Sequence, residues 1–154
     1  MSKKISPTFS PTYDIINMGN KVGDKTMNKY LEIIKNLISH QTEEEWFEFK
    51  ENWYEAHGIG EYISALSNAA AICRREYAYL IWGINDETRE VLGTKFNYRV
   101  DVKGEPLEHY LARQLKPDIV FSFHEVDFDN KRVVLLEIPV AKNIPTSFDG
   151  IRYI

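Results

Sequence analysis

The sequence has little cysteine, no excess of positive charge and no long hydrophobic stretch. Of its 154 residues only Cys73 is a cysteine, which excludes an intramolecular disulfide and a cysteine-based zinc site. Lys and Arg number 19 against 23 Asp and Glu, so no basic half or tail indicates nucleic acid. No apolar run approaches the ~18 residues of a membrane span, and no signal peptide is visible. We therefore expect a protein of the reducing cytoplasm without a membrane partner.

Paired metal ligands and phosphate-binding loops are absent as well. None of the four histidines has a second His or Cys at ligand spacing, so a zinc site is not expected. Gly58-Ile59-Gly60 lacks the rest of either glycine-rich phosphate-binding pattern. Ser64 and Ser67 have no adjacent base that would make either one a nucleophile. None of these patterns therefore indicates a catalytic site.

The chain length predicts one domain, which is long enough to bury its own core. Residues 1–23, broken by proline and glycine, are expected to form an N-terminal arm that is ordered in part. Residues 24–154 are expected to form the domain. The pattern of the last residues, Arg152-Tyr153-Ile154, is typical of a strand that is just beginning. We therefore expect this domain to be a fragment of, or truncated from, a longer protein.

Hydrophobic periodicity predicts three helices and several strands. The predicted helices are 26–39, 59–74 and 105–115, and the predicted strands are 46–50, 77–84, 90–93, 119–126 and 132–140. The turn at Asp129-Asn130 predicts that the last two strands form an antiparallel hairpin. The order of elements predicts an α+β fold, with a mixed, mostly antiparallel sheet packed with about three helices.

Three acidic places are candidates for chemistry. They are the run Glu43-Glu44-Glu45, Glu48 among aromatic residues, and Asp86 directly after the strand 77–84. Convergent carboxylates bind Mg²⁺ or Mn²⁺, and a metal ion held in this way positions a phosphodiester and activates its nucleophile. Each place also has an ordinary interpretation: a solvated edge, the outward face of an edge strand, and a turn residue.

The spacing of Glu43 and Glu48 sets a geometric condition on joint metal binding. In a straight strand the two side chains would face opposite sides, roughly 16 Å apart at ~3.3 Å per residue. Joint binding therefore requires the chain to bend near residues 43–45. Glu48-Phe49-Lys50 also matches the second half of a restriction-nuclease-type metal motif. The upstream candidate for its partner, Asp24, precedes a predicted helix, which weakens that alternative.

Basic and aromatic residues are the candidates for contact with nucleic acid, because cations pair with phosphates and rings stack on unpaired bases. The cationic candidates are Lys50, Arg74, Arg75, Arg89, Lys95, Arg99, Lys142 and Arg152. The aromatic candidates are Trp46, Trp53, Tyr54 and Trp82, of which Trp82 is expected in the core.

An ordered set of motifs covers residues 42–154. The motifs are Glu43-x-Glu45-x-x-Glu48-Phe49-Lys50, Gly60 to Asn68, Leu80 to Thr88 with Val91 to Thr94, Val133 to Pro139, and Pro145 to Ile154. No single piece is specific, but the set in this order resembles the Schlafen/AlbA-type domain. That domain occurs in many bacterial proteins described as DNA-binding proteins or transcriptional regulators.

The resemblance implies an α+β domain that binds RNA or DNA. In vertebrate Schlafen proteins a paired version of the domain is an endoribonuclease for tRNA-like substrates, with a metal-binding carboxylate triad. Glu43, Glu48 and Asp86 match that triad, and the resemblance implies that they are catalytic and hold Mg²⁺ or Mn²⁺. We expect Lys50, Arg89, Lys142 and Arg152 to contact the nucleic acid.

The sequence departs from the family pattern in two respects. The family often has Asn-Thr-x-Gly-Gly between helix and strand, whereas Asn68 is followed here by an alanine-rich stretch and Arg74-Arg75. The vertebrate enzymes clamp RNA between two lobes, so this single lobe would need a homodimer or further domains of a longer chain to rebuild the groove. Three functions stay open: a metal-dependent endoribonuclease, a non-catalytic DNA-binding or sensor module of a transcriptional regulator, and a protein-interaction or nucleotide-sensing domain.

Overall fold

The computed structural model describes residues 21–40 and 44–154. Most of the expected N-terminal arm therefore lies outside the described residues, and so does Glu43. Residues 21–23, which we assigned to the arm, form the first residues of helix α2 (Lys21–Ile38). That helix confirms the predicted amphipathic helix 26–39 and extends it toward the N-terminus.

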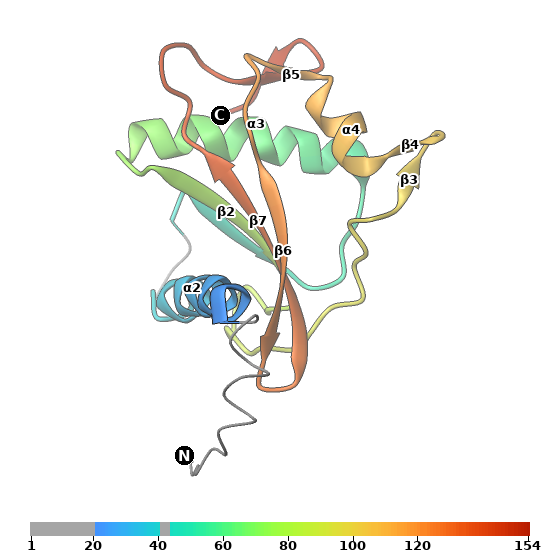
Figure 1. Cartoon of the computed structure of the whole chain (residues 1–154). Helices are drawn as coiled ribbons and strands as arrows, with labels where there is room; N and C mark the ends of the chain where they lie inside the picture. The colour runs from blue at the N-terminus through green and yellow to red at the C-terminus, as the bar shows by residue number, and fades with distance from the viewer. Residues whose placement is uncertain (1–20, 41–43) are drawn as a thin grey trace, which may run out of the picture.

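The described residues form an α+β fold, as the sequence predicted (Figure 1). The other helices are α3 (Ala56–Ile72) and α4 (Leu107–Ala112). The strands are β1 (Phe47–Lys50), β2 (Tyr77–Trp82), β3 (Asp101–Val102), β4 (Glu105–Pro106), β5 (Leu115–Lys116), β6 (Ser122–Phe128), β7 (Lys131–Pro139), β8 (Ser147–Phe148) and β9 (Ile151–Arg152). No helix in this part of the chain combines the length and apolarity that crossing a membrane requires.

The main sheet has the strand order β1-β2-β7-β6. Strand β1 is parallel to β2, and the other two pairs are antiparallel. Strands β6 and β7 form the predicted hairpin, and Asp129 and Asn130 at its turn both have positive φ, as a tight hairpin turn requires. Two smaller sheets, β3-β4 and β5-β8-β9, were not predicted, because two-residue strands carry no periodic signal. The strand expected to begin at Arg152 is β9, which begins at Ile151 and ends at Arg152.

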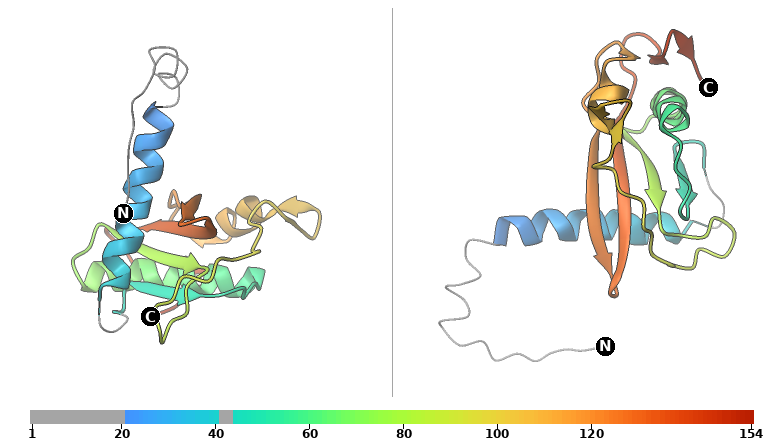
Figure 2. Two further views of the ribbon diagram at one scale, coloured as in Figure 1. Left: turned by 90° about the horizontal axis from the view of Figure 1, so that it is seen from below. Right: turned by 90° about the vertical axis from the view of Figure 1, so that its right-hand side faces the viewer.

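The two long helices cover opposite faces of the main sheet. On one face the ring of His40, just after α2, contacts Phe47, and Tyr30 of α2 stacks on His124 of β6. On the other face the ammonium of Lys50 lies over the ring of Tyr62 in α3. Helix α2 runs across the strands, as the right-hand view of Figure 2 shows. Successive side chains along a strand of this sheet therefore point alternately toward α2 and toward α3.

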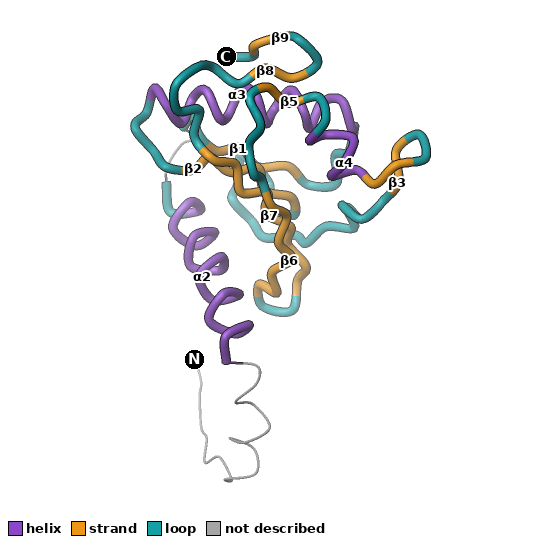
Figure 3. Tube along the Cα trace, turned by 45° about the horizontal axis from the view of Figure 1, so that its top comes forward, coloured by secondary structure: helices purple, strands orange, loops and turns teal. Residues whose placement is uncertain are grey.

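Helix α3 begins earlier than predicted, at Ala56. Its N-cap is Glu55, whose carboxylate accepts hydrogen bonds from the backbone N–H groups of His57 and Gly58 at 3.0 and 2.8 Å. Glutamate is not among the usual capping residues, so the sequence pattern gave no start signal here. On its outer side α3 is covered by β8 and β9 (Figure 3). A Cβ at Gly60 would overlap the ring of Phe148, so only glycine permits this close approach.

Two predicted elements are shorter than expected. The predicted helix 105–115 is only α4, because its flanks pair as β4 and β5 instead. The predicted return strand 90–93 is reduced to one bridge between Ile84 and Val91. The N–H groups of Leu92 and Gly93 both donate to the carbonyl of Gly83, and the N–H of Thr94 donates to that of Arg132, so no regular strand ladder continues. Trp82 is fully buried, as predicted, and its indole N–H donates to the carbonyl of Trp53 at 2.7 Å.

Candidate functional site

Glu48 and Lys50 lie next to each other on the α3 face of β1. They are two residues apart on a strand, so their side chains share a face. The Nζ atom of Lys50 lies 3.9 Å from Oε2 of Glu48, and both side chains are about one quarter exposed. The same ammonium lies 5.3 Å from the ring centroid of Trp53 and 5.0 Å from that of Tyr62. The two rings and the carboxylate therefore fix the position of the Lys50 charge at the surface.

The parallel pairing of β1 and β2 brings the turn of Asp86 to the carboxyl end of β1. The backbone N–H groups of Gly83 and Ile84 donate to the carbonyl of Lys50 at 2.7 and 3.2 Å. The side-chain amide of Asn85 donates to Oε2 of Glu51 at 2.8 Å. Asp86 follows in this turn and is exposed. The turn that carries the third predicted acid thus adjoins the end of the strand that carries the second.

The acidic run before β1 is described only in part. Glu43 lies outside the described residues. Glu44 accepts a hydrogen bond from the indole N–H of Trp46 at 3.3 Å and pairs with His40 at 3.2 Å. The N–H of Phe47 donates to the carbonyl of Glu44, so the chain turns directly before β1. Within residues 21–40 and 44–154, no group of three His, Cys, Asp or Glu side chains is placed to hold a metal ion.

The predicted nucleic-acid contacts fall in different places. Arg89 lies on the α2 face, where its guanidinium stacks 4.9 Å from the ring centroid of Phe49 and donates to the carbonyl of Leu37. It is therefore on the other face of β1 from Lys50. Lys142 and Arg152 are both exposed and line one hollow of about 360 Å³ beside the carboxyl end of α3. The structure brings these last two together and separates them from Arg89.

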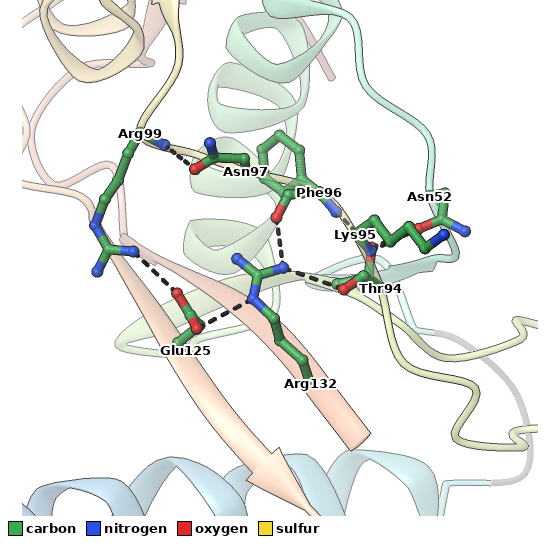
Figure 4. Close-up of polar contacts among 8 residues, drawn as sticks. All are labelled: Asn52, Thr94, Lys95, Phe96, Asn97, Arg99, Glu125 and Arg132. Atoms are coloured by element: carbon green, nitrogen blue, oxygen red, sulfur yellow. Dashed lines mark hydrogen bonds and ion pairs between the residues drawn. The ribbon is translucent and has the colours of Figure 1, made fainter. Parts of the chain in front are cut away.

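An arginine that the sequence did not single out holds the segment 94–99 (Figure 4). Nη1 of Arg132 donates to the carbonyls of Thr94 and Phe96 at 3.1 and 2.6 Å, and Nε pairs with Glu125 at 3.1 Å. Arg99 pairs with the same carboxylate at 3.0 Å. The hydrogen bond from Arg132, with a second from Arg99, holds the pKa of Glu125 below its usual value. Arg99, a predicted phosphate contact, is thus already paired.

A buried polar cluster lies beneath α2. Glu137 is 8% exposed, and its Oε1 accepts a hydrogen bond from the hydroxyl of Tyr30 at 3.2 Å. Burial, and then the nearby Glu137, raise the pKa of Tyr30 to about 12. The same two causes raise the pKa of Tyr79. Burial lowers the pKa of His124, whose Nε2 lies 2.8 Å from the hydroxyl of Ser122. The only sequence signal for this cluster was a glutamate inside an apolar run.

Twelve chains of solved structures match this chain, including the following two. The crystal structure of the DIP2311 protein from Corynebacterium diphtheriae matches with a TM-score of 0.47 and 15% identity, over 83% of this chain and 24% of that one. This chain therefore spans about a quarter of that protein. The N-terminal domain of a protein from Nitrosomonas europaea, related to the ATP-dependent DNA helicase RecG, matches with a TM-score of 0.49 and 18% identity. That match covers 79% of this chain and 82% of the other. Comparison with curated proteins gives no match.

The family comparison covers the part of the chain that carries the motifs. The model of the Schlafen, AlbA_2 family matches residues 43–154, which is most of the sequence. The match begins at Glu43 and includes β1, the turn of Asp86 and the carboxyl-terminal strands. The chain therefore belongs to the Schlafen, AlbA_2 family.

Proposed function

We propose that this domain binds nucleic acid and cleaves RNA as a metal-dependent endoribonuclease that uses Glu43, Glu48 and Asp86. The observation that carries the proposal is the pair of Glu48 and Lys50, 3.9 Å apart, beside the turn of Asp86. Membership of the Schlafen, AlbA_2 family supports the nucleic-acid part of the proposal.

The pair combines the two charges that phosphodiester cleavage needs. The carboxylate of Glu48 suits a hard metal ion, and the ammonium of Lys50 suits a phosphate oxygen. Because the rings of Trp53 and Tyr62 also contact the ammonium, it is already oriented before a substrate arrives. Partial exposure of both groups gives a phosphate access to them.

The donor set suits Mg²⁺ or Mn²⁺, because both ions prefer carboxylate oxygens and retain bound water. Glu43, Glu48 and Asp86 would hold the ion, and the ion would supply Lewis-acid stabilisation and an activated water. Lys50 would bind and orient the phosphate group that is attacked. Asp86, on an exposed turn, would approach from the carboxyl ends of the two parallel strands.

The alternative is a non-catalytic module that binds DNA or senses a ligand in a regulator. The hollow that Lys142 and Arg152 share favours this alternative, because it offers cations to a polymer without any of the three acids. Contacts there would give affinity that depends on salt and does not depend on metal.

The experiment compares cleavage and binding in variants whose new side chain has about the same size as the one it replaces. The purified chain is incubated with tRNA and with single-stranded DNA, in Mn²⁺ or in EDTA, beside Glu48→Gln and Asp86→Asn. The matched controls are Glu87→Gln and Glu90→Gln, each of which changes an exposed carboxylate close to Asp86 in the sequence. Lys50→Met tests the phosphate contact.

The endoribonuclease proposal predicts that EDTA, Glu48→Gln and Asp86→Asn each abolish cleavage, whereas both controls keep it. Lys50→Met would weaken cleavage through a higher KM. Salt-sensitive binding with no cleavage in any condition would support the non-catalytic module instead. The absence of binding to both polymers would contradict both functions and favour a protein-interaction or nucleotide-sensing domain.

A further inference from the structure

The chain passes from α3 into β2 at the left of Figure 1, and a polar hollow lies at this connection. It has a volume of about 390 Å³ and is lined by Arg74, Arg75, Glu76, Tyr77 and Tyr79. Strand β2 begins at Tyr77 and ends at Trp82. The hollow therefore lies at the amino end of the strand whose carboxyl end carries the turn of Asp86.

The backbone of the two arginines is fixed by the end of α3. The N–H of Arg75 donates to the carbonyl of Ala70 at 2.9 Å, and the N–H of Arg74 donates to that of Ala71 at 3.3 Å. This is the Schellman arrangement, in which the residue after the C-cap is left-handed and is usually glycine. Arg74 occupies that place with φ 59°. A long cationic side chain thus stands where glycine would be less strained, which suggests that the side chain has a use.

The two guanidinium groups are available to an anion. The guanidinium of Arg75 lies 4.0 Å from the ring centroid of Trp46, which orients it. Neither arginine forms an ion pair with any carboxylate in the described part of the chain, and both are exposed. One carboxylate, that of Glu76, lines the hollow with them, so cations outnumber it. Tyr77 is 39% exposed and lines the same hollow as the two arginines.

We propose that this hollow binds a phosphate of a single-stranded nucleic-acid backbone, with the ring of Tyr77 against an adjacent base. Two arginines match the oxygens of a phosphodiester, and an exposed ring beside them suits an unpaired base. This inference rests on the proposed nucleic-acid binding. A bound strand would run along the edge strand β1, over roughly 13 Å at ~3.3 Å per residue, from Arg75 beside Trp46 toward Lys50.

The test measures how the affinity for a single-stranded oligonucleotide depends on salt, between about 50 and 200 mM. The variant is Arg74→Gln with Arg75→Gln. The matched control is Arg99→Gln with Arg113→Gln, which removes the same charge from arginines that are paired with Glu125 and Glu105. Arg74→Gln alone and Arg75→Lys are added, because neither removes the charge that stacks on Trp46. Each oligonucleotide is used with and without a 5′-phosphate.

The expected result is that the double variant binds about tenfold more weakly and that its salt slope falls by about 1.4, since each single-strand contact contributes ~0.7. Arg74→Gln alone should lose about half of that slope, and Arg75→Lys should keep it. The control double variant should retain both the salt slope and the affinity of the wild type.

Other results would overturn the inference in distinguishable ways. If the wild type binds but the slope is unchanged in the double variant, this hollow is not a contact, and the proposed function stands. If both double variants lose affinity equally, net charge explains the loss. If the loss appears only with 5′-phosphorylated strands, the hollow binds a terminal phosphate and not the backbone. If the wild type binds no oligonucleotide, the proposed function itself fails.

Discussion

Helices α2 and α3 pack on opposite faces of the same sheet, but the buried polar groups that hold them differ. On the side of α3 that the carboxyl-terminal segment covers, the side-chain amide of Asn68 donates to the carbonyls of Thr146 and Tyr153 at 2.9 and 2.8 Å, and its oxygen accepts a hydrogen bond from the N–H of Thr146 at 2.7 Å. Under α2, Glu137 has a bond from Tyr30, while its Oε2 has no hydrogen-bond partner among the described residues.

The difference concerns how firmly each helix is held. A buried polar network whose members are all satisfied fixes one arrangement, whereas an unsatisfied buried oxygen opposes burial by about 1–3 kcal/mol. Helix α3 and the segments that cover it should therefore unfold only with the whole domain. Helix α2 should separate from the sheet at a lower free energy. Of the four predictions that follow, three test this comparison and one tests how Arg132 holds the segment 94–99, and they run from the largest expected effect to the smallest.

Asn68→Ala should lower the free energy of unfolding by about 3 kcal/mol, because it removes a hydrogen bond in each direction and leaves backbone groups of Thr146 unsatisfied. Urea denaturation followed by circular dichroism measures the loss. Asn143→Ala, at an exposed position nearby, is the control and should change stability by less than about 0.5 kcal/mol. A loss for Asn68→Ala no larger than that of its control would contradict the assignment of α3 as the firmly held helix.

Arg132→Met should lower the free energy of unfolding by about 2 kcal/mol, because it removes the donor to the carbonyls of Thr94 and Phe96 and to Glu125. The same urea titration measures it, and hydrogen exchange should show faster exchange in 94–99. Arg113→Met removes an exposed arginine from its pair with Glu105 and should change stability by less than about 1 kcal/mol. Equal losses in the two variants would show that Arg132 does not hold this segment.

Tyr30→Phe should lower the free energy of unfolding at neutral pH by about 1 kcal/mol, because Glu137 loses its hydrogen-bond donor. Folding raises the pKa of Tyr30 to about 12, above the value of about 10 for an unfolded tyrosine. Above pH ~10 the unfolded chain releases this proton while the folded chain keeps it, so wild-type stability falls as pH rises toward 12.

The gap between the wild type and Tyr30→Phe should therefore shrink with rising pH, which urea titrations at a series of alkaline pH values would show. Tyr54→Phe, whose side chain is 43% exposed, is the control at neutral pH. A gap that stays constant up to pH ~12 would show that the Tyr30 hydroxyl ionises as easily in the folded state as in the unfolded one.

The change in stability at acid pH that depends on His124 should be the smallest of these effects. Burial lowers the pKa of His124, which faces Tyr30, Glu137, Lys29 and Ser122. Below the unfolded value of about 6.5, the unfolded chain takes up the proton more readily than the folded chain, so stability falls as pH decreases. His124→Phe should flatten this decline, whereas His109→Asn, at an exposed position in α4, should keep it. If the stability of His124→Phe falls with decreasing pH as steeply as that of the wild type, then His124 does not contribute to the weaker hold on α2.

Local patterns in the sequence were enough for the elements with strong periodicity. Helix α2, the buried strands β2 and β7 and the turn at Asp129-Asn130 all follow from spacing and turn chemistry. The prediction failed where the signal was local but unusual, as at Glu55, or where pairing with a distant segment replaced the local preference, as in 105–115. Hydrogen bonds between distant segments outweigh propensities of a few tenths of a kcal/mol per residue.

The candidate site was predictable to a similar extent. That Glu48 and Lys50 share a face follows from the two-residue period of a strand, once β1 is recognised. That the turn of Asp86 adjoins them follows only from the parallel pairing of β1 and β2, which no local pattern indicates. Whether Glu43 joins them stays a prediction.

The sequence by itself determined which residues carry charge, which segments bury their side chains and which family the motifs resemble, because these properties depend on residue type and near spacing. Only the tertiary structure decided which arginines are already paired, as Arg99 and Arg132 are, and which remain available, as Arg74 and Arg75 do. A charge is neutralised by groups within a few ångströms in space, and the fold alone sets those neighbours.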